Sequence, residues 1–178
     1  MSPLRIKRVS EEQTMQTPPA SLVSRVRCVL ACAFALCTAL GNPGVARAAE
    51  TADECFEKAG AYQGVNPLVL RAVAWRESKG DAAAINHNTN GSIDVGQLQI
   101  NSIHFSELAR QGIPHRALID PCVNIFVAAW LLKQKMVRYG NTWRAIGAYH
   151  SESPHERDAY ARSIQAILVS WGQLQRGH

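Results

Sequence analysis

Residues 66–94 read NPLVLRAVAWRESKGDAAAINHNTNGSID, and this stretch decides the fold. Its first half carries the signals of a helix, because Asn66 is a good N-cap and Pro67 suits the first helical position. Apolar residues then recur at helical spacing, and Gly80 ends the element. The second half is small and polar, and its Asn-Gly pair predicts a loop with a short β-hairpin.

Further helices are predicted on both sides of this stretch. A capping-box pattern at Thr51 and Glu54 opens a helix that runs to about Gln63. After the polar loop, helices are expected from residue 101 or 102 to about 111, from Asp120-Pro121 to Gly140, and from Thr142 through Tyr149. A second capping box, Ser153-Pro154-His155-Glu156, opens the last helix.

Apolar stripes on the two longest helices define the predicted core. The first stripe comprises Val123, Val127, Trp130, Leu131 and Val137, and the second comprises Tyr160, Ile164, Ile167, Leu168 and Trp171. For Trp130, packing in the core is favoured over stacking on a sugar. These elements predict one compact domain that is mainly helical, with one polar excursion.

The first 48 residues have the pattern of a secretory signal peptide. Residues 28–40 form an uncharged apolar run that is too short for a transmembrane helix, which needs about 20 residues. Basic residues precede the run, and an Ala-x-Ala pattern predicts cleavage after Ala48. Met15 is a second candidate start. The alternatives are an uncleaved membrane anchor and a buried helix of the fold, and the domain itself is expected to cover residues 49–178.

Removal of this leader changes what the charge implies. Residues 1–48 hold six Lys/Arg and two Asp/Glu, a net charge of +4, which leaves +1 of the total +5 for residues 49–178. The mature chain is therefore nearly neutral and has neither a basic stripe nor a known nucleic-acid-binding motif, so a nucleic-acid partner is not expected.

Two of the five cysteines lie beyond the leader. Cys55 and Cys122 have one intramolecular pairing available in an exported chain, and a disulfide is the favoured interpretation over two separate thiols. The chain has no CxxC motif and no close Cys/His cluster, so a metal site is not expected, and no cofactor is predicted.

Glu77 is the candidate acid. It falls in the last turn of its predicted helix, where the negative end of the helix dipole and partial burial favour a protonated carboxyl group. A carboxylic acid with a raised pKa can protonate a glycosidic oxygen. The alternative is an exposed glutamate paired with Arg76 or Lys79.

Two later segments offer neutral polar groups. Residues 94–101 (DVGQLQIN) combine glycine with amides that suit the hydroxyl and acetamide groups of a polysaccharide. Residues 148–151 (AYHS) place a phenol beside an imidazole at the end of an apolar helix. By themselves, residues 94–101 fit a loop-to-helix junction at least equally well. For residues 148–151, a packed tyrosine beside a surface histidine is the commoner outcome.

Three motifs follow one another in the chain: Glu-Ser, Gly-x-x-Gln-Ile-Asn and Ala-Tyr-His. Together they resemble the motifs of the soluble lytic transglycosylase domain, and the resemblance covers residues 55–171. The two cysteines further resemble the specialised members that accompany type III and type IV secretion, conjugation and pilus assembly. The resemblance implies a lysozyme-like α+β fold that is mostly helical, with Glu77 as general acid and then base. Ser78 is expected as its hydrogen-bonding neighbour, and Gln99, Tyr149 and His150 as sugar contacts. Leu98 and His150 depart from the methionine and asparagine that are commonest there.

The resemblance also implies a reaction and a location. The family cleaves the β-1,4 bond between N-acetylmuramic acid and N-acetylglucosamine in peptidoglycan and forms a 1,6-anhydro ring, so the resemblance implies this reaction for the exported chain. We therefore expect a periplasmic or secreted monomer that opens the wall for a secretion or pilus apparatus. One alternative is a hydrolytic muramidase with Asp94 as second carboxylate. The other is a glycan-binding scaffold protein without catalysis.

Overall fold

The computed structural model describes residues 51–175, so the predicted leader and its cleavage site lie outside the described residues. The helices are α1 (Ala52–Gln63), α2 (Pro67–Ser78), α3 (Phe105–Arg110), α4 (Pro121–Tyr139), α5 (Trp143–His150) and α6 (Pro154–Ser170). Two short 3₁₀ helices are η1 (Ser102–His104) and η2 (His115–Ile119), and the strands are β1 (Ile85–His87), β2 (Ile93–Val95) and β3 (Ile100–Asn101). This confirms the mostly helical α+β class.

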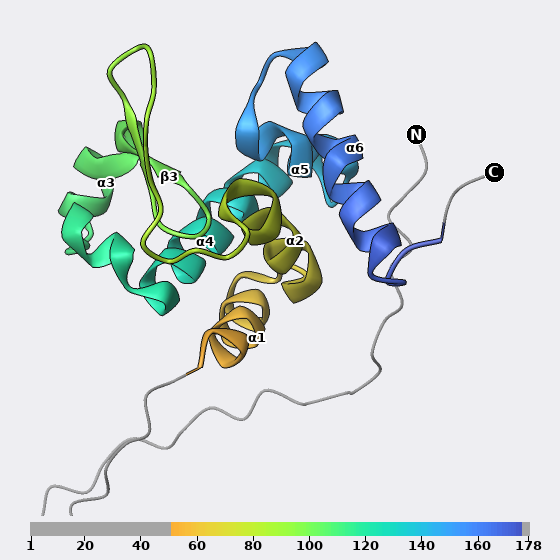
Figure 1. Cartoon of the computed structure of the whole chain (residues 1–178), viewed down its shortest axis with the longest axis horizontal. Coiled ribbons are helices and arrows are strands. Elements are labelled where there is room, and N and C mark those ends of the chain that lie inside the picture. The colour runs from red at the N-terminus through yellow and green to blue at the C-terminus, as the bar shows by residue number, and fades with distance from the viewer. Residues whose placement is uncertain (1–50, 176–178) are drawn as a thin grey trace, which may run out of the picture. The chain divides into compact units, whose positions relative to one another are not determined.

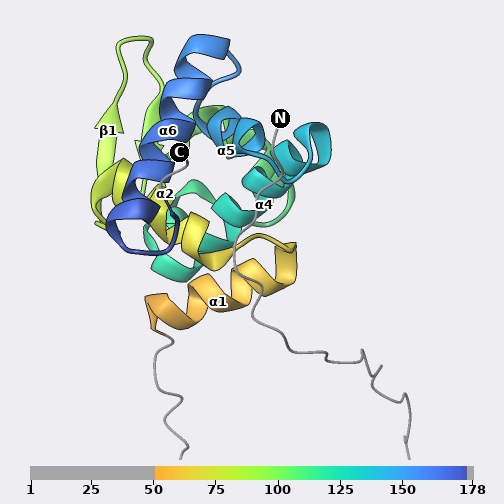
Figure 2. The ribbon, with the colours of Figure 1, turned by 90° about the vertical axis from the view of Figure 1, so that its right-hand side faces the viewer.

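Helix α4 is the centre of the domain. It contacts α1, α2, α5, η2 and β3, and α6 packs against α2 and α5 (Figures 1 and 2). Its residues Ile125, Ala128 and Leu132 are almost completely buried because the other elements surround this face. Among the described residues, no helix has the length and apolar character that crossing a membrane requires.

The predicted caps place Glu77 where the sequence indicates. Thr51 and Glu54 make both hydrogen bonds of the capping box at α1, at 3.3 and 3.0 Å. The Asn66 side chain accepts a hydrogen bond from the Leu68 amide at 2.8 Å and starts α2. Since α2 ends at Ser78, Glu77 lies in its last turn, as predicted.

The polar excursion is larger than a hairpin. Strands β1 and β2 form the predicted antiparallel hairpin, with Asn86 opposite Asp94. A third strand pairs Ile100 with Val95, in the place where a helix was expected to begin. Both of these apolar residues are buried, and an extended pairing lets Ile100 point into the core. The helix expected from residue 101 or 102 is instead η1 followed by the short α3.

The prediction that all members of the two core stripes are buried is wrong for two residues. Val137 is 77% exposed, because at 100° per residue it lies roughly 80° around α4 from the buried Val127. Trp171 follows the end of α6, is 37% exposed, and packs edge-on against Trp75 with ring centroids 6.5 Å apart. Trp130 is partly buried against the core and also borders open space.

The start of α6 also differs from the predicted capping box. Ser153 is the N-cap residue, but its side chain makes no capping hydrogen bond. The Ser151 hydroxyl takes this place: it donates to Glu156 at 2.6 Å and accepts from the Ser153 amide at 3.1 Å. The carboxylate at the first turn is therefore held by a serine two residues earlier than expected.

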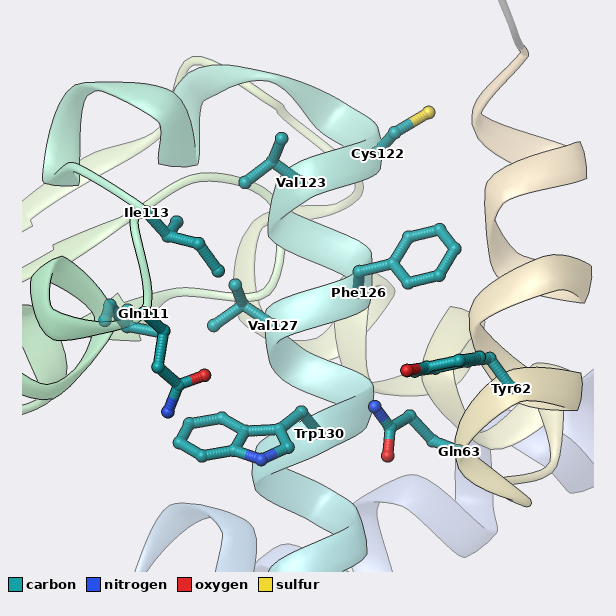
Figure 3. Close-up of a pocket in the computed structure, with 10 residues that line it drawn as sticks. Tyr62, Gln63, Gln111, Ile113, Cys122, Val123, Phe126, Val127 and Trp130 are labelled. Atoms are coloured by element: carbon teal, nitrogen blue, oxygen red, sulfur yellow. The ribbon is translucent and has the colours of Figure 1, made fainter. Parts of the chain in front are cut away.

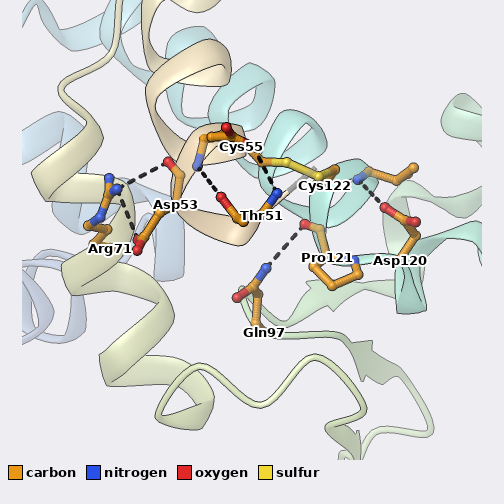
Figure 4. Close-up of a disulfide and its surroundings, with 10 residues drawn as sticks. Thr51, Asp53, Cys55, Arg71, Gln97, Asp120, Pro121 and Cys122 are labelled. Carbon is orange, nitrogen blue, oxygen red and sulfur yellow. Dashed lines mark hydrogen bonds and ion pairs between the residues drawn. A yellow bond between two sulfur atoms is a disulfide. The ribbon is translucent and has the colours of Figure 1, made fainter. Parts of the chain in front are cut away.

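The predicted disulfide is present and joins α1 to the first turn of α4. Cys55 and Cys122 are 67 residues apart, with their Cα atoms 5.3 Å from each other (Figure 4). Cys55 is completely buried. Beside the bridge, the Gln97 side chain donates a hydrogen bond to the Pro121 carbonyl oxygen at 3.1 Å (Figure 4). The same end of α4 is thus fixed to α1 and to the loop after β2.

Removing this disulfide should lower the free energy of unfolding by about 2–5 kcal/mol, because the unfolded chain without the cross-link has more conformational entropy. The variant for this measurement is Cys55→Ala/Cys122→Ala, since alanine adds no polar group at the buried position. Urea unfolding of this variant is compared with that of the oxidised wild type. An unchanged urea midpoint, or two freely alkylated thiols in unreduced wild type, would contradict the expectation.

Candidate active site

Glu77 meets a second helix at its carboxyl group. Its side chain is half-buried, and the hydroxyl of Tyr160 on α6 donates a hydrogen bond to its Oε1 atom at 2.5 Å. Tyr160 itself is only 4% exposed. The two residues are 83 positions apart in the chain, so the contact between α2 and α6 creates this site.

The surroundings raise the pKa of Glu77 above its usual value. Burial is the largest cause, because it disfavours the charged carboxylate. The hydrogen bond from Tyr160 and electrostatic interactions with His150 and Arg76 oppose the shift, whereas the interaction with Asp94 adds to it. The net result is a carboxyl group that holds its proton to higher pH than a solvent-exposed glutamate does.

Tyr160 is the residue of this site that sequence reasoning missed, since it was assigned to the apolar face of the last helix. Its hydroxyl gave the available signal, because a buried tyrosine usually has a hydrogen-bond partner. The His150 ring stacks on Tyr160 with centroids 4.8 Å apart and an angle of 6° between the planes. The structure thus brings the predicted residues Glu77 and His150 together through Tyr160.

Tyr149 approaches the site from α5. Its hydroxyl donates to the Leu98 carbonyl oxygen at 2.9 Å, which ties α5 to the loop between β2 and β3. The pKa of Tyr149 is held well above its usual value, first by burial and then by the charges of Glu77 and Asp94. The phenol therefore stays protonated and can act as a hydrogen-bond donor.

Gln99 and Ser78 support the backbone around the carboxyl group. The Gln99 amide nitrogen donates to the Gly96 carbonyl oxygen at 2.7 Å, and its amide oxygen accepts from Asn86 at 2.6 Å. Ser78 was expected to hydrogen-bond Glu77, but its hydroxyl donates to the Gln97 carbonyl oxygen at 2.9 Å. Ser78 thereby fastens the end of α2 to the loop. Whether Gln99 or Ser78 also contacts sugar stays a prediction.

Gly96 lets this loop pass close to α4. Its φ of +78° is in the left-handed region, and a Cβ atom added there would lie 2.6 Å from the Leu118 carbonyl oxygen and 2.2 Å from the Asn124 amide nitrogen. Glycine is required on both grounds. Asn124 was not predicted: it is fully buried and hydrogen-bonds the loop at Val95 and Leu98.

Asp94 is held by two asparagine amides, one just after β1 and one on β3. Its two carboxylate oxygens accept hydrogen bonds from Asn88 at 2.8 Å and from Asn101 at 2.7 Å. Its charge acts on both Glu77 and Tyr149, whose pKa values it raises. Across residues 51–175, His, Cys, Asp and Glu side chains form no group of three placed to share a metal ion.

Replacing Tyr160 by phenylalanine should extend activity to higher pH. The hydroxyl stabilises the charged form of Glu77, so its loss raises the pKa of Glu77 further, and the acid stays protonated over a wider range. The measurement is the alkaline limb of the pH–rate profile. Tyr139→Phe is the matched control, because Tyr139 donates at 2.5 Å to a different carboxylate, that of Glu152. An alkaline limb that lies at lower pH in Tyr160→Phe than in the wild type would contradict the expectation.

Comparisons with known proteins place the chain in a family. The model of the transglycosylase SLT domain matches residues 54–164. The X polypeptide of Escherichia coli is 39% identical over 125 residues, which are 66% of this chain and 74% of that protein. Invasion protein IagB of Salmonella typhimurium (strain SL1344) is 36% identical over 124 residues, 68% of this chain and 78% of the relative. Protein IpgF of Shigella flexneri is 38% identical over 116 residues, 62% of this chain and 76% of its own length.

The matched region runs from α1 into α6 and contains Glu77, Tyr149, His150 and Tyr160. It therefore includes the Glu77 carboxyl group, the Tyr160 hydroxyl that donates to it, and the loop between β2 and β3. The resemblance drawn from the three motifs is confirmed, together with the lysozyme-like fold. This chain belongs to the transglycosylase SLT domain family.

Proposed function

We propose that this protein is a lytic transglycosylase that cuts the β-1,4 bond between N-acetylmuramic acid and N-acetylglucosamine in peptidoglycan. The observation that carries the proposal is the half-buried Glu77 carboxyl group, whose pKa is raised and whose orientation is fixed by Tyr160. A carboxyl group whose pKa is raised is the group that glycosidic cleavage needs as its acid.

The proposed reaction uses this one carboxyl group twice. The protonated Glu77 gives its proton to the glycosidic oxygen as the bond to the anomeric carbon of muramic acid breaks. The resulting carboxylate then takes the proton of the 6-hydroxyl group of the same muramic acid, whose oxygen bonds to the anomeric carbon. The ring closes as a 1,6-anhydro sugar, and Glu77 is protonated again without a water molecule being consumed.

The hydrogen bonds of Asp94 support this reaction over hydrolysis. A hydrolase that inverts needs a carboxylate free to activate water on the far side of the sugar. Both carboxylate oxygens of Asp94 already accept hydrogen bonds, from Asn88 and Asn101. We assign Asp94 the role of shaping the sheet and raising the pKa of Glu77.

The product and the Asp94→Asn variant together test the reaction. Digested peptidoglycan should yield muropeptides that end in 1,6-anhydromuramic acid, each lighter by one water than a hydrolytic product. Asp94→Asn should keep turnover within about tenfold, whereas loss of an essential general base would cost far more. Reducing-end muramic acid as the main product, with an inactive Asp94→Asn enzyme, would overturn the transglycosylase assignment in favour of a muramidase.

We also propose an exported enzyme that opens the wall locally for a secretion or pilus apparatus. The support is the leader pattern of residues 1–48 together with the relatives, two of which are named invasion protein and IpgF. The disulfide fits an oxidising compartment such as the periplasm. N-terminal sequencing of the exported chain tests the export step, and a chain that keeps residues 28–40 would contradict cleavage after Ala48.

A further inference from the structure

A pocket of about 550 Å³ opens beside α4 (Figure 3). It lies between the end of α1, the first half of α4 and the segment around the end of α3. Its lining residues are Tyr62, Gln63, Leu108, Gln111, Ile113, Cys122, Val123, Phe126, Val127 and Trp130. None of these ten contributes to the site described above, and the volume is in the range of small-ligand pockets.

The pocket has an apolar floor and an aromatic rim. Leu108 and Val127 are 1% and 3% exposed and form part of the floor. Phe126 and Trp130 are partly buried at its side, and Tyr62 is 78% exposed, with its ring centroid 6.4 Å from that of Phe126. Aromatic faces of this kind can receive the apolar face of a ligand.

The polar groups at the rim have no hydrogen-bond partner within the described part of the chain. Figure 3 shows the Gln63 and Gln111 amides on either side of the Trp130 ring. Within residues 51–175, neither amide side chain makes a hydrogen bond, and neither does the Tyr62 hydroxyl. These groups are available to a ligand that both donates and accepts hydrogen bonds.

The absence of charge on the lining side chains of the pocket narrows the class of ligand further. None of its ten lining side chains is ionised at neutral pH, so the pocket offers no partner for an acidic or basic peptide. A chain of N-acetylated sugars matches it: the C–H face of the sugar suits Trp130, the acetamide methyl suits the apolar floor, and the neutral acetamide and hydroxyl groups suit the two glutamines.

We propose that this pocket binds N-acetylated sugar units of a glycan strand, at a site separate from the one that contains Glu77. The inference rests on the proposed function in so far as peptidoglycan supplies the strand. Binding here keeps the enzyme on its polymer while the Glu77 site is empty. It also gives Trp130 a role in sugar stacking, in contrast to the purely structural role that the sequence favoured.

The first test observes the pocket directly, in the Glu77→Gln background so that the probe is not cleaved. The full mature chain is labelled with ¹⁵N-tryptophan and titrated with N-acetylchitotetraose. The indole resonance of Trp130, assigned through Trp130→Phe, should shift in a saturable way. A Trp130 resonance that stays unmoved at saturating sugar would overturn the proposal.

The second test measures retention on isolated sacculi by sedimentation. In the same background, Tyr62→Ala/Gln111→Ala should weaken binding by about tenfold, because one aromatic face and one amide are lost. Both residues are exposed, so the fold should persist, and Gln134→Ala, which removes an exposed amide elsewhere on α4, should bind as before. Equal sacculus binding by the pocket variant would overturn the proposal and leave a protein partner as the occupant to seek.

These results are separable from the proposed reaction. With Glu77 intact, the pocket variant should keep the wild-type turnover and the anhydro product on short soluble glycan strands, since the pocket shares no residue with the Glu77 site. Absence of anhydro products from the wild-type enzyme would refute the transglycosylase reaction, whereas the two binding tests would still decide whether the pocket takes sugar.

Discussion

Replacing Glu77 by glutamine should lower peptidoglycan cleavage by at least about 10²–10⁴-fold, the usual contribution of a general acid and base. Glutamine keeps the size of the side chain, and its amide oxygen can still accept the hydrogen bond from Tyr160. It has no proton to give to the glycosidic oxygen. Zymography in a gel that contains peptidoglycan, followed by quantification of released muropeptides, measures the loss.

A surface glutamate provides the control for this variant. Glu57 is exposed on α1 and pairs with Arg71 at 3.1 Å, so Glu57→Gln makes the same chemical change away from the site and should keep full activity. Retention of more than about a tenth of the activity in Glu77→Gln would show that another group supplies the proton.

The same variant should be more stable than the wild type at neutral pH. Because the pKa of Glu77 is raised in the folded state, its contribution to stability is fully present below the unfolded-state pKa and is lost as pH rises through the folded-state pKa. Glutamine does not titrate and avoids this loss. Thermal unfolding across pH should therefore show an advantage of Glu77→Gln that appears as pH rises and vanishes in acid. An advantage that is independent of pH would refute this explanation.

The parts of the fold that the sequence predicts are those with local signals. Thr51, Asn66 and Asp120 each cap a helix through a hydrogen bond to a residue two or three positions away, so the pattern is visible in a short window. Glu77 could be placed because it lies between two such signals, the Asn66 cap and Gly80. The disulfide was predictable because Cys55 and Cys122 are the cysteines that remain after the leader.

The parts that the sequence did not predict depend on distant partners. Tyr160 looks like any member of an apolar stripe until α6 packs against α2 and brings its hydroxyl to Glu77. Strand β3 is only two residues long, and Ile100 pairs with Val95 because both sit over the core. Ser78 also depends on a distant partner. It was expected to hydrogen-bond its neighbour Glu77, but it donates to Gln97, 19 positions away.

Asn124 is the clearest case of such a residue, and its replacement should have the largest effect on stability. It is fully buried in α4, where its amide nitrogen donates to the carbonyl oxygens of Val95 at 2.9 Å and Leu118 at 3.0 Å. Its amide oxygen accepts from the Leu98 amide at 2.9 Å. Asn124→Leu keeps the number and branching of the side-chain heavy atoms but removes a hydrogen bond from each of three buried backbone groups.

Each unpaired group costs about 1–3 kcal/mol, so Asn124→Leu should lower the free energy of unfolding by about 5 kcal/mol. A domain of this size is stable by only about 5–15 kcal/mol, so the variant should be close to unfolding at room temperature. Urea denaturation gives the value for the wild type and the variant. Gln134→Leu is the control on the same helix: its side chain is exposed, and its effect should stay within about 0.5 kcal/mol.

The fraction of Asn124→Leu that stays folded should also lose turnover, because this residue controls the loop next to Glu77. Leu98 is held on both sides, its amide by Asn124 and its carbonyl oxygen by the Tyr149 hydroxyl. Without the first bond, the second no longer fixes Tyr149 in the site. Initial rates at low temperature, divided by the folded fraction from circular dichroism, separate this effect from unfolding. If the rate per folded molecule equals that of the wild type, the hydrogen bond from Ser78 to Gln97 is sufficient to hold the loop, and Asn124 acts on stability alone.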